Sequence, residues 1–443
     1  MNVDRPLPHR PAGEPPLRRA SAATVAVVVV LVLALVAGGV AWFASGDDDD
    51  DDTPAVPVEP DDGDTSPADD ISPRTVTCVT GAIAELFDPS ARVELPEGTA
   101  EQFDAVARIV QDQRELQFDT IPEPTYVTAD EMSDRIAGAF ARDYPDDVER
   151  ADEELYVALG AIPAGSDLRG ELATLYGEQV AGYYDPTTDE LVVLGDEGDG
   201  FDATELTIIA HELEHALADQ ALGLPDDDPH TADPDAAAAA AAVVEGDAVL
   251  THSMFQLVAI DLEELLNISD EQVAASQEAL EAAPPFLAAQ LLFPYNEGLG
   301  FVCERQRGGW SAVDDLYRDP PTTTAQILFP ERYDRREAAA DAPDPIAPDG
   351  AGWEEVRRQT FGAADLMFLF DIAGVDGPRE AAAAWAGGEM VQWRRGDEVA
   401  VRLSFVEHAD AAPGTLCEAV TEWVSTRPDG AATCDGPTVA VSL

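Results

Sequence analysis

Apolar residues recur with a helical period in the middle of the chain. The positions that share this spacing are Leu206, Ile209, Ala210, Leu213, Ala216 and Leu217. Such a stripe is typical of an amphipathic helix that packs one face against a core. Asp202 can cap this helix, with Glu205 as its reciprocal capping partner. The pattern therefore predicts a helix that begins near Asp202 and includes residues 207–217.

The segments before and after this helix also show regular patterns. Apolar periodicity predicts earlier helices over residues 101–118, 129–142 and 152–159. β-Prone residues at 179–184 and 190–194 flank a Pro-containing turn and predict a hairpin. Its edge could add an extended peptide as a further strand, or the hairpin could be purely structural. Later helices are also predicted: one opened by seven alanines and containing residues 243–248, and further ones over 261–266, 270–282 and 285–292.

The last quarter of the chain predicts a separate small unit. Composition marks residues 336–350 as a linker. Residues 351–443 then predict an α+β arrangement, with helices within 354–373 and 413–424, a hairpin of 389–395 with 398–406, and a strand at 438–443.

The amino-terminal segment predicts a membrane anchor. Residues 20–46 contain no charged side chain, and crossing a bilayer takes about 20 residues. Arginines precede this run and aspartates follow it, so the positive-inside rule predicts a cytoplasmic tail at 1–19 and export of the rest. A cleaved signal peptide ending near Gly39-Val-Ala41 is the alternative. Residues 47–74 are too acidic and too poor in apolar residues to fold, and predict a disordered linker. The resulting expectation is a single-pass cell-membrane protein with an extracellular catalytic region.

The charge of the chain excludes one class of partner, and its cysteine content predicts disulfides. The formal net charge is −63, from 88 acidic and 25 basic residues, and the sequence has no lysine. Binding to nucleic acid through a basic patch is therefore not expected. The acidity suits a strongly solvated, salt-adapted surface, although a GC-rich genome would also favour Arg and Ala. An even cysteine number predicts two disulfides, with Cys417 paired to the nearby Cys434 and Cys78 to Cys303.

The predicted central helix carries the sequence His211-Glu-Leu-Glu-His215, an H-E-x-x-H motif. Histidines four residues apart lie on one helical face, so both imidazoles can bind one metal ion. Glu212 is rotated by about 100° from His211 and can reach a metal-bound water without being a ligand. Catalytic zinc usually takes a third protein ligand. Candidates are Glu245, whose buried carboxylate would be costly without a partner or cation, and the histidines His230 and His252, the latter also readable as packing.

Three stretches together resemble gluzincin-type (peptidase MA-like) zinc metallopeptidases, in particular a poorly characterised exported bacterial and archaeal group. The stretches are Gly182-Tyr-Tyr-Asp-Pro186, the motif continued to Gln220, and Glu245-Gly-Asp-Ala248. Sequence around residues 293–298, 308–314 and 320–328 resembles the downstream part of that group. The resemblance covers roughly residues 170–335. The long polar loop and poly-Ala tract before Glu245 depart from it.

The resemblance implies an α+β fold with a mainly helical zincin-like catalytic domain over residues 75–335 and a small hairpin before the active-site helix. It implies Zn²⁺ bound by His211, His215 and Glu245, which lies 30 positions after His215, with Glu212 as general base. The metzincin class is excluded, because the positions of its glycine and third histidine hold Ala218 and Ala221.

The implied activity is hydrolysis of a peptide or protein substrate through a zinc-activated water. An oxyanion donor is also needed, and Tyr295 is the candidate, with Tyr183 and Tyr184 as alternatives. Two other functions remain open: a non-catalytic gluzincin-fold surface module that binds a partner, and hydrolysis of a non-peptide substrate.

Overall fold

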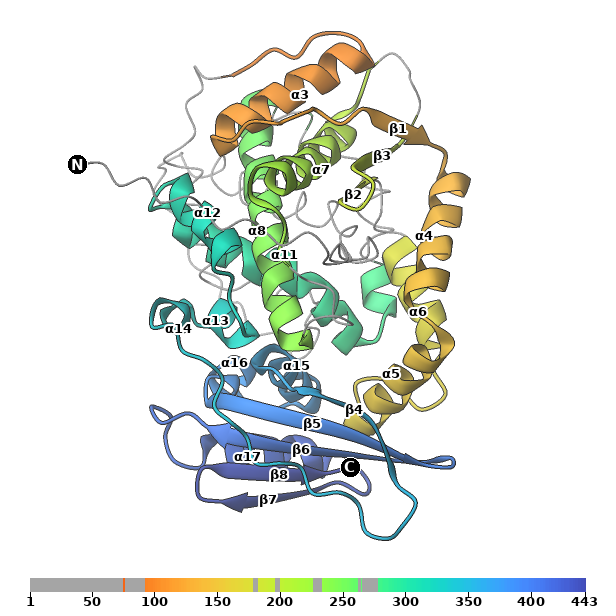
Figure 1. The fold of residues 1–443 in the computed structure, drawn as a ribbon, viewed down its shortest axis with the longest axis vertical. Helices are drawn as coiled ribbons and strands as arrows, with labels where there is room; N and C mark the ends of the chain where they lie inside the picture. The colour runs from red at the N-terminus through yellow and green to blue at the C-terminus, as the bar shows by residue number, and fades with distance from the viewer. Residues whose placement is uncertain are drawn as a thin grey trace, which may run out of the picture.

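The computed structural model describes residue 75 and residues 92–177, 182–195, 200–225, 233–261, 264 and 278–443. Two layers of different composition are visible in Figure 1: a larger, mainly helical part and a smaller part built on a sheet beneath it. This arrangement confirms the predicted α+β fold class.

The helical part begins with elements that surround the site. They are α3 (Thr99–Arg114), β1 (Pro124–Val127), α4 (Ala129–Asp143), α5 (Asp146–Leu159), α6 (Leu168–Gly177), β2 (Gly182–Asp185) and β3 (Glu190–Leu194). The β2–β3 hairpin was predicted, and it joins β1 in a sheet of order β1-β3-β2. β1 pairs with β3 in parallel and β2 pairs with β3 antiparallel. β2 is therefore an edge strand.

Long buried helices form the centre of this part. They are α7 (Ala203–Leu222), α8 (Pro234–Ala259) and α11 (Pro285–Gln306), followed by the shorter α12 (Trp310–Arg318), α13 (Thr324–Leu328) and α14 (Pro330–Asp334). Figure 1 shows α8 and α11 side by side, and α7 packs against α8. α7 was predicted to be amphipathic but is buried on nearly all sides. α11 was expected to end near residue 292, but it continues through Pro294 to Gln306.

The C-terminal part packs helices on a five-stranded antiparallel sheet. Its elements are β4 (Glu354–Thr360), α15 (Ala363–Ala373), α16 (Pro378–Ala382), β5 (Trp385–Arg395), β6 (Glu398–Glu407), α17 (Thr415–Ser425), β7 (Ala431–Asp435) and β8 (Thr438–Ser442). The strand order is β4-β5-β6-β8-β7. The predicted hairpin is β5–β6. β4 and β7 were not predicted.

Buried side chains of this part are continuous with those of the helices above. One hydrophobic cluster includes Phe286 of α11, Phe368 of α15 and Phe405 of β6. Gln392 of β5 also donates a hydrogen bond to the backbone oxygen of Ala151 in α5 at 3.0 Å. The two parts of the fold therefore share a core.

Cys417 and Cys434 form a disulfide, as predicted, and tie α17 to β7. Cys303 is also disulfide-bonded. Its predicted partner Cys78 lies outside the described residues.

The predicted transmembrane anchor and single-pass membrane localisation must be corrected. Across the part of the chain that the structure describes, no helix has both the length and the apolar character needed to cross a membrane. The segments 1–19, 20–46 and 47–74, on which that prediction depended, lie outside the described residues.

Candidate metal centre

α7 begins with the capping arrangement expected from the sequence. Asp202 Oδ1 accepts a hydrogen bond from the backbone N–H of Glu205 at 2.9 Å. Glu205 Oε2 in turn accepts one from the N–H of Asp202 at 2.8 Å. The cap satisfies two backbone N–H groups at the start of α7 and fixes where the helix begins.

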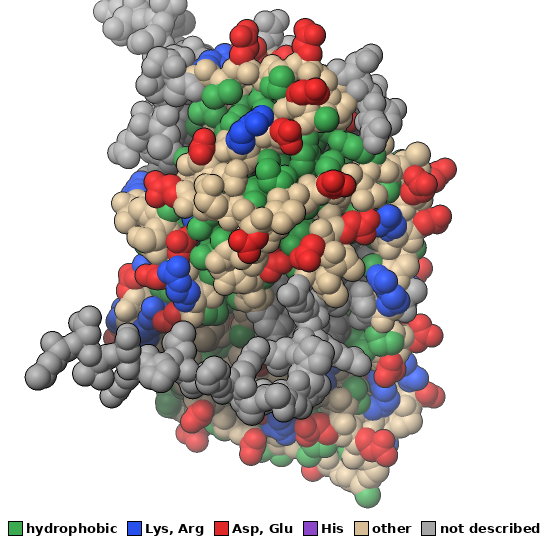
Figure 2. All heavy atoms as spheres, turned by 45° about the horizontal axis from the view of Figure 1, so that its top comes forward, with side chains coloured by type: hydrophobic (Ala, Val, Ile, Leu, Met, Phe, Trp, Pro, Cys, Tyr) green, Lys and Arg blue, Asp and Glu red, His purple; other side chains and the backbone are tan. Residues whose placement is uncertain are grey.

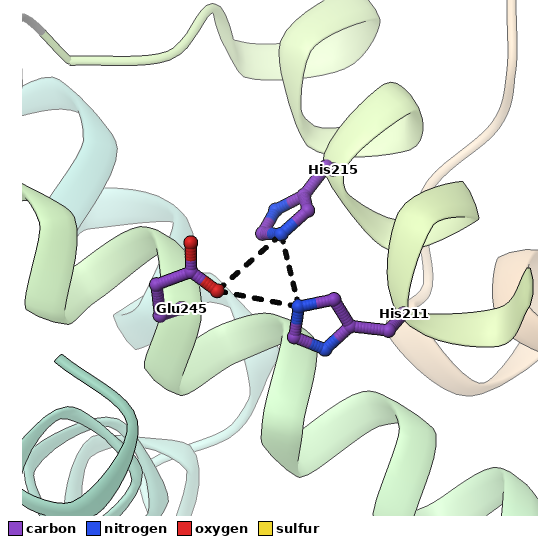
Figure 3. A group of neighbouring side chains, drawn as sticks. All are labelled: His211, His215 and Glu245. Atoms are coloured by element: carbon purple, nitrogen blue, oxygen red, sulfur yellow. Dashed lines mark hydrogen bonds and ion pairs between the residues drawn. The ribbon is translucent and has the colours of Figure 1, made fainter. Parts of the chain in front are cut away.

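Three side chains from α7 and α8 converge in the interior (Figure 3). His211 and His215 project from successive turns of α7, and Glu245 faces them from α8. The Nε2 atoms of the two histidines are 3.1 Å apart. Glu245 Oε2 lies 3.2 Å from Nε2 of His211 and 3.5 Å from Nε2 of His215. All three residues are buried.

These distances fit a single bound metal ion. A tetrahedral ion with bonds of about 2.0–2.1 Å holds its ligand atoms about 3.3 Å apart. The three observed separations, 3.1, 3.2 and 3.5 Å, lie around that value. Two imidazole nitrogens and a carboxylate oxygen are also the donor set that catalytic zinc sites use. The group could therefore hold a metal ion.

His252 fixes the orientation of the His211 ring. The Nδ1 atoms of the two rings are 3.0 Å apart, in the interior of the protein. Burial, together with His211 and His215, holds the pKa of His252 well below its usual range, so His252 is neutral and its Nδ1 can accept. In the tautomer in which His211 donates from Nδ1, the lone pair of its Nε2 points at the centre. His252 thus lies behind a candidate ligand, and His230 lies outside the described residues.

The charges of the centre are coupled. Burial lowers the pKa of His215, but Glu245, Glu212 and Glu214 outweigh it and raise that pKa to about 10. Burial likewise raises the pKa of Glu245, and the two histidines outweigh it so that the pKa is lowered. Without a metal ion, a proton on His215 therefore balances the Glu245 carboxylate. A metal cation would take the place of that proton.

Glu212 is held by the edge strand β2. Its Oε2 accepts a hydrogen bond from the backbone N–H of Tyr184 at 2.9 Å. Burial raises the pKa of Glu212 to about 7, with Glu245 adding to the shift and His215 opposing it. A carboxyl group with a pKa near neutrality can both accept and release a proton.

The tyrosines considered as oxyanion donors have different surroundings. Tyr295 is buried on α11, and its ring lies 6.4 Å from that of His211 with nearly parallel planes. Tyr184 donates its hydroxyl hydrogen bond to Asp219 at 3.0 Å. The Tyr183 hydroxyl accepts from Arg135 at 3.1 Å. Of the three, Tyr295 is the one placed against a candidate ligand.

Three successive residues of α8 contact three different elements. Glu245 faces the histidines. Gly246 lies so close to α11 that a Cβ atom on it would come within 2.3 Å of the carbonyl carbon of Gly298. Asp247 accepts hydrogen bonds from Nε of Arg114 at 3.0 Å. A rotation of about 100° per residue explains how adjacent positions meet three different elements.

A buried ionic cluster beside the centre was not predicted. The Arg114 guanidinium of α3 lies 3.0 Å from Asp247, 2.9 Å from Asp314 and 3.9 Å from Glu214, and over the Trp310 ring. Burial and the nearby Asp247 raise the pKa of Glu214 well above its usual range. Glu214 Oε2 is 3.8 Å from Nδ1 of His215, so the cluster adjoins the second candidate ligand. The sequence feature that could have indicated this cluster is Glu214, an acidic residue inside a buried helix.

Comparisons with protein-family models, curated proteins and solved structures gave no match to this chain.

Proposed function

We propose that this protein is a zinc-dependent peptidase that resembles the gluzincin type. His211, His215 and Glu245 would hold the zinc ion, and Glu212 would act as general base. The observation that carries the proposal is the set of three ligand-atom separations, 3.1, 3.2 and 3.5 Å, which suits one tetrahedral ion. Zinc would supply Lewis acidity toward a substrate carbonyl and lower the pKa of a water molecule.

The chain's own residues account for the proton movements. Glu212, directly beside the candidate ligand His211, accepts a proton from the attacking water and passes it to the leaving amine. The hydrogen bond from Tyr184 orients this carboxylate and ties it to the edge strand β2. An extended peptide that added to this edge would lie beside Glu212. Tyr295 is the proposed donor to the oxyanion.

The donor set alone also suits another metal chemistry. Two histidines and one carboxylate bind Fe(II) in non-haem oxygenases. The acidic residue that directly follows His211, held beside the centre by Tyr184, favours hydrolysis, because an oxygenase needs no general base at that position.

Glu212→Gln tests the catalytic part of the proposal. We expect kcat for cleavage of a mixed peptide library to fall at least about 100-fold, because the amide cannot take a proton. The zinc content, measured by atomic emission, should stay near one per chain. Glu205→Gln is the matched control: it makes the same chemical change on α7 in the capping box, where glutamine also serves, and should keep full activity. Unchanged cleavage by Glu212→Gln would remove this residue from the mechanism.

Glu245→Ala tests the metal site separately. We expect the zinc content to fall sharply while the helical circular dichroism stays native. Zinc retained at one per chain would exclude Glu245 as the third ligand. Iron in place of zinc in the wild type would point to the oxygenase chemistry, and a zinc-loaded protein inert to every peptide would favour a binding module or a non-peptide substrate.

A further inference from the structure

A cavity of about 570 Å³ adjoins the candidate metal centre. Glu245 and Tyr295 both line it, so it opens directly beside the proposed ligand and the proposed oxyanion donor. α5, α8, α11, α15 and β4 contribute most of the rest of its lining. In Figure 1, α15 and β4 lie at the lower end of α8, with α5 to one side. The cavity therefore runs from the metal centre toward the C-terminal part.

The walls of the cavity are largely apolar. They include aromatic and aliphatic side chains from three helices and a loop, namely Leu155, Phe286, Leu291, Phe293, Phe361 and Phe368. Such walls suit the hydrocarbon part of a long side chain.

The charged groups of the cavity are nearly all acidic. Asp147, Asp152, Asp235, Glu245 and Asp365 line it, and Arg357 is the one basic residue among its described lining. Arg357 is already paired with Asp152 at 2.5 Å. The cavity thus carries an excess of negative charge that its own arginine does not neutralise.

Asp235 and Asp365 have no cationic partner among the described residues. Asp235 is only 4% exposed. Its Oδ1 accepts from the backbone N–H of Thr324 at 3.2 Å and from the same residue's hydroxyl, while Oδ2 has no hydrogen-bond partner. Asp365 accepts from Gln290 Nε2 at 3.0 Å and is more accessible. Burial raises the pKa of Asp235 to about 7 and that of Asp365 to about 6, as expected for buried carboxylates that lack a counter-charge.

The position of Asp365 relative to the metal centre suits a single side chain. Asp365 is bound to Gln290, and Gln290 precedes Tyr295 by five residues on α11, which is about 7.5 Å along the helix axis. A long side chain that entered beside Tyr295 could extend along the apolar walls and end at Asp365.

Resting on the proposed peptidase function, we propose that this cavity is the specificity pocket for a cationic side chain, arginine or lysine, of the peptide substrate. The apolar walls hold the alkyl stem and Asp365 receives the charged end, whose positive charge favours the ionised form of the nearby Asp235.

Binding to the inactive Glu212→Gln protein, loaded with zinc, tests this proposal without any turnover. The probes are alanine-based octapeptides with one arginine at each position in turn, each compared with the peptide that carries neutral citrulline there. We expect one register in which arginine binds about tenfold more tightly or better, because a charged hydrogen bond to a buried carboxylate is lost in citrulline. Equal affinity for arginine and citrulline at every position would overturn the proposal. Tighter binding of a peptide with leucine in place of the preferred arginine would also overturn it.

Variants of the cavity identify which carboxylates cause the preference for arginine. Asp365→Asn should reduce the preference for arginine to about twofold or less, and Asp235→Asn should weaken it in the same direction. Asp147→Asn, at the exposed rim of the same cavity, is the control and should keep it. A preference that survived in both Asp365→Asn and Asp235→Asn would place the cation elsewhere. The arginine preference can hold even if no peptide is cleaved, and cleavage can occur without it, so the two proposals fail independently.

Discussion

Asp235 illustrates how burial controls the chemistry of single residues in this protein. It is the second residue of α8, and its carboxyl group is enclosed by Thr324 and Gly362. Burial raises its pKa from 3.8 to about 7. In the folded protein this group therefore keeps a proton over a pH range in which the unfolded chain has released it.

Asp235 should make stability fall with rising pH. Because the folded-state pKa is raised, the stabilising contribution is present below about pH 4 and is lost as the pH rises through about 7. Asp235→Asn cannot ionise, and its amide oxygen can still accept from Thr324. We expect this variant to gain stability relative to wild type between pH 5 and pH 8, by at most about 4 kcal/mol. Urea unfolding of both proteins at the two pH values measures the difference. A difference that does not change with pH would contradict the raised pKa.

The residues of the metal centre were predictable to very different degrees. His211, Glu212 and His215 follow from spacing alone, because four residues make about one helical turn. Glu245 could be singled out as a carboxylate in an apolar helix. Arg114 could not, because its partner Asp247 is 133 positions away and no local pattern specifies which helix faces of a bundle meet.

The contact between α8 and α11 likewise brings together helix faces that no local sequence pattern specifies. Gly246 and Gly298 face each other where the helices cross, and a Cβ atom on Gly298 would come within 2.1 Å of the Ala242 carbonyl oxygen. The backbones are therefore in direct contact. This crossing sets how far Glu245 reaches toward the histidines of α7.

Two glycine-to-alanine variants should change the stability of the protein in opposite directions. Gly246→Ala places a methyl group against the backbone of α11, which cannot move aside cheaply, and should destabilise the protein by about 3 kcal/mol or more. Gly138→Ala, in the exposed face of α4, meets no atom within 4 Å and should stabilise it by about 0.5–1 kcal/mol. Thermal and urea unfolding measure both changes. A neutral Gly246→Ala would mean that the helices can separate without cost.

Prediction of the elements succeeded where the pattern is local. The helices α3, α4 and α7 and the hairpins β2–β3 and β5–β6 have clear periods and turn signals. β4 was missed because its sequence, Glu-Glu-Val-Arg-Arg-Gln-Thr, has little strand propensity, and it is a strand because it pairs with β5 about 30 residues later. The helix predicted over 285–292 ended before Pro294, yet α11 continues through it because tertiary packing outweighs one lost hydrogen bond.

At the scale of the whole molecule, net charge opposes folding. The formal charge of −63 comes from 88 acidic and 25 basic residues. Figure 2 shows acidic side chains spread over the face that it presents, with fewer arginines between them. Like charges confined to a compact volume repel one another more strongly than in the unfolded chain.

Added salt should therefore stabilise this protein. Raising NaCl from about 0.01 M to about 0.15 M shortens the Debye length from about 30 Å to about 8 Å and screens this repulsion. We expect the melting temperature at pH 7.5 to rise by about 5 °C or more, with most of the gain below about 0.2 M. KCl at the same ionic strength should have the same effect.

Added salt also weakens ion pairs at the surface, which lowers stability. The size of this loss, compared with the relief of repulsion, decides whether salt stabilises the protein. Pairs such as Arg318–Asp315 and Arg395–Glu398 are weakened by salt, but exposed pairs contribute only about 0–1 kcal/mol each. Each arginine can neutralise one carboxylate, so at least 63 acidic charges of the chain have no basic counterpart. The repulsion among them should outweigh the lost pairs. The effect should shrink toward pH 4.1, the isoelectric point, where the net charge vanishes. A melting temperature that fell with salt at pH 7.5, or rose equally at both pH values, would show that repulsion between carboxylates is not what limits stability.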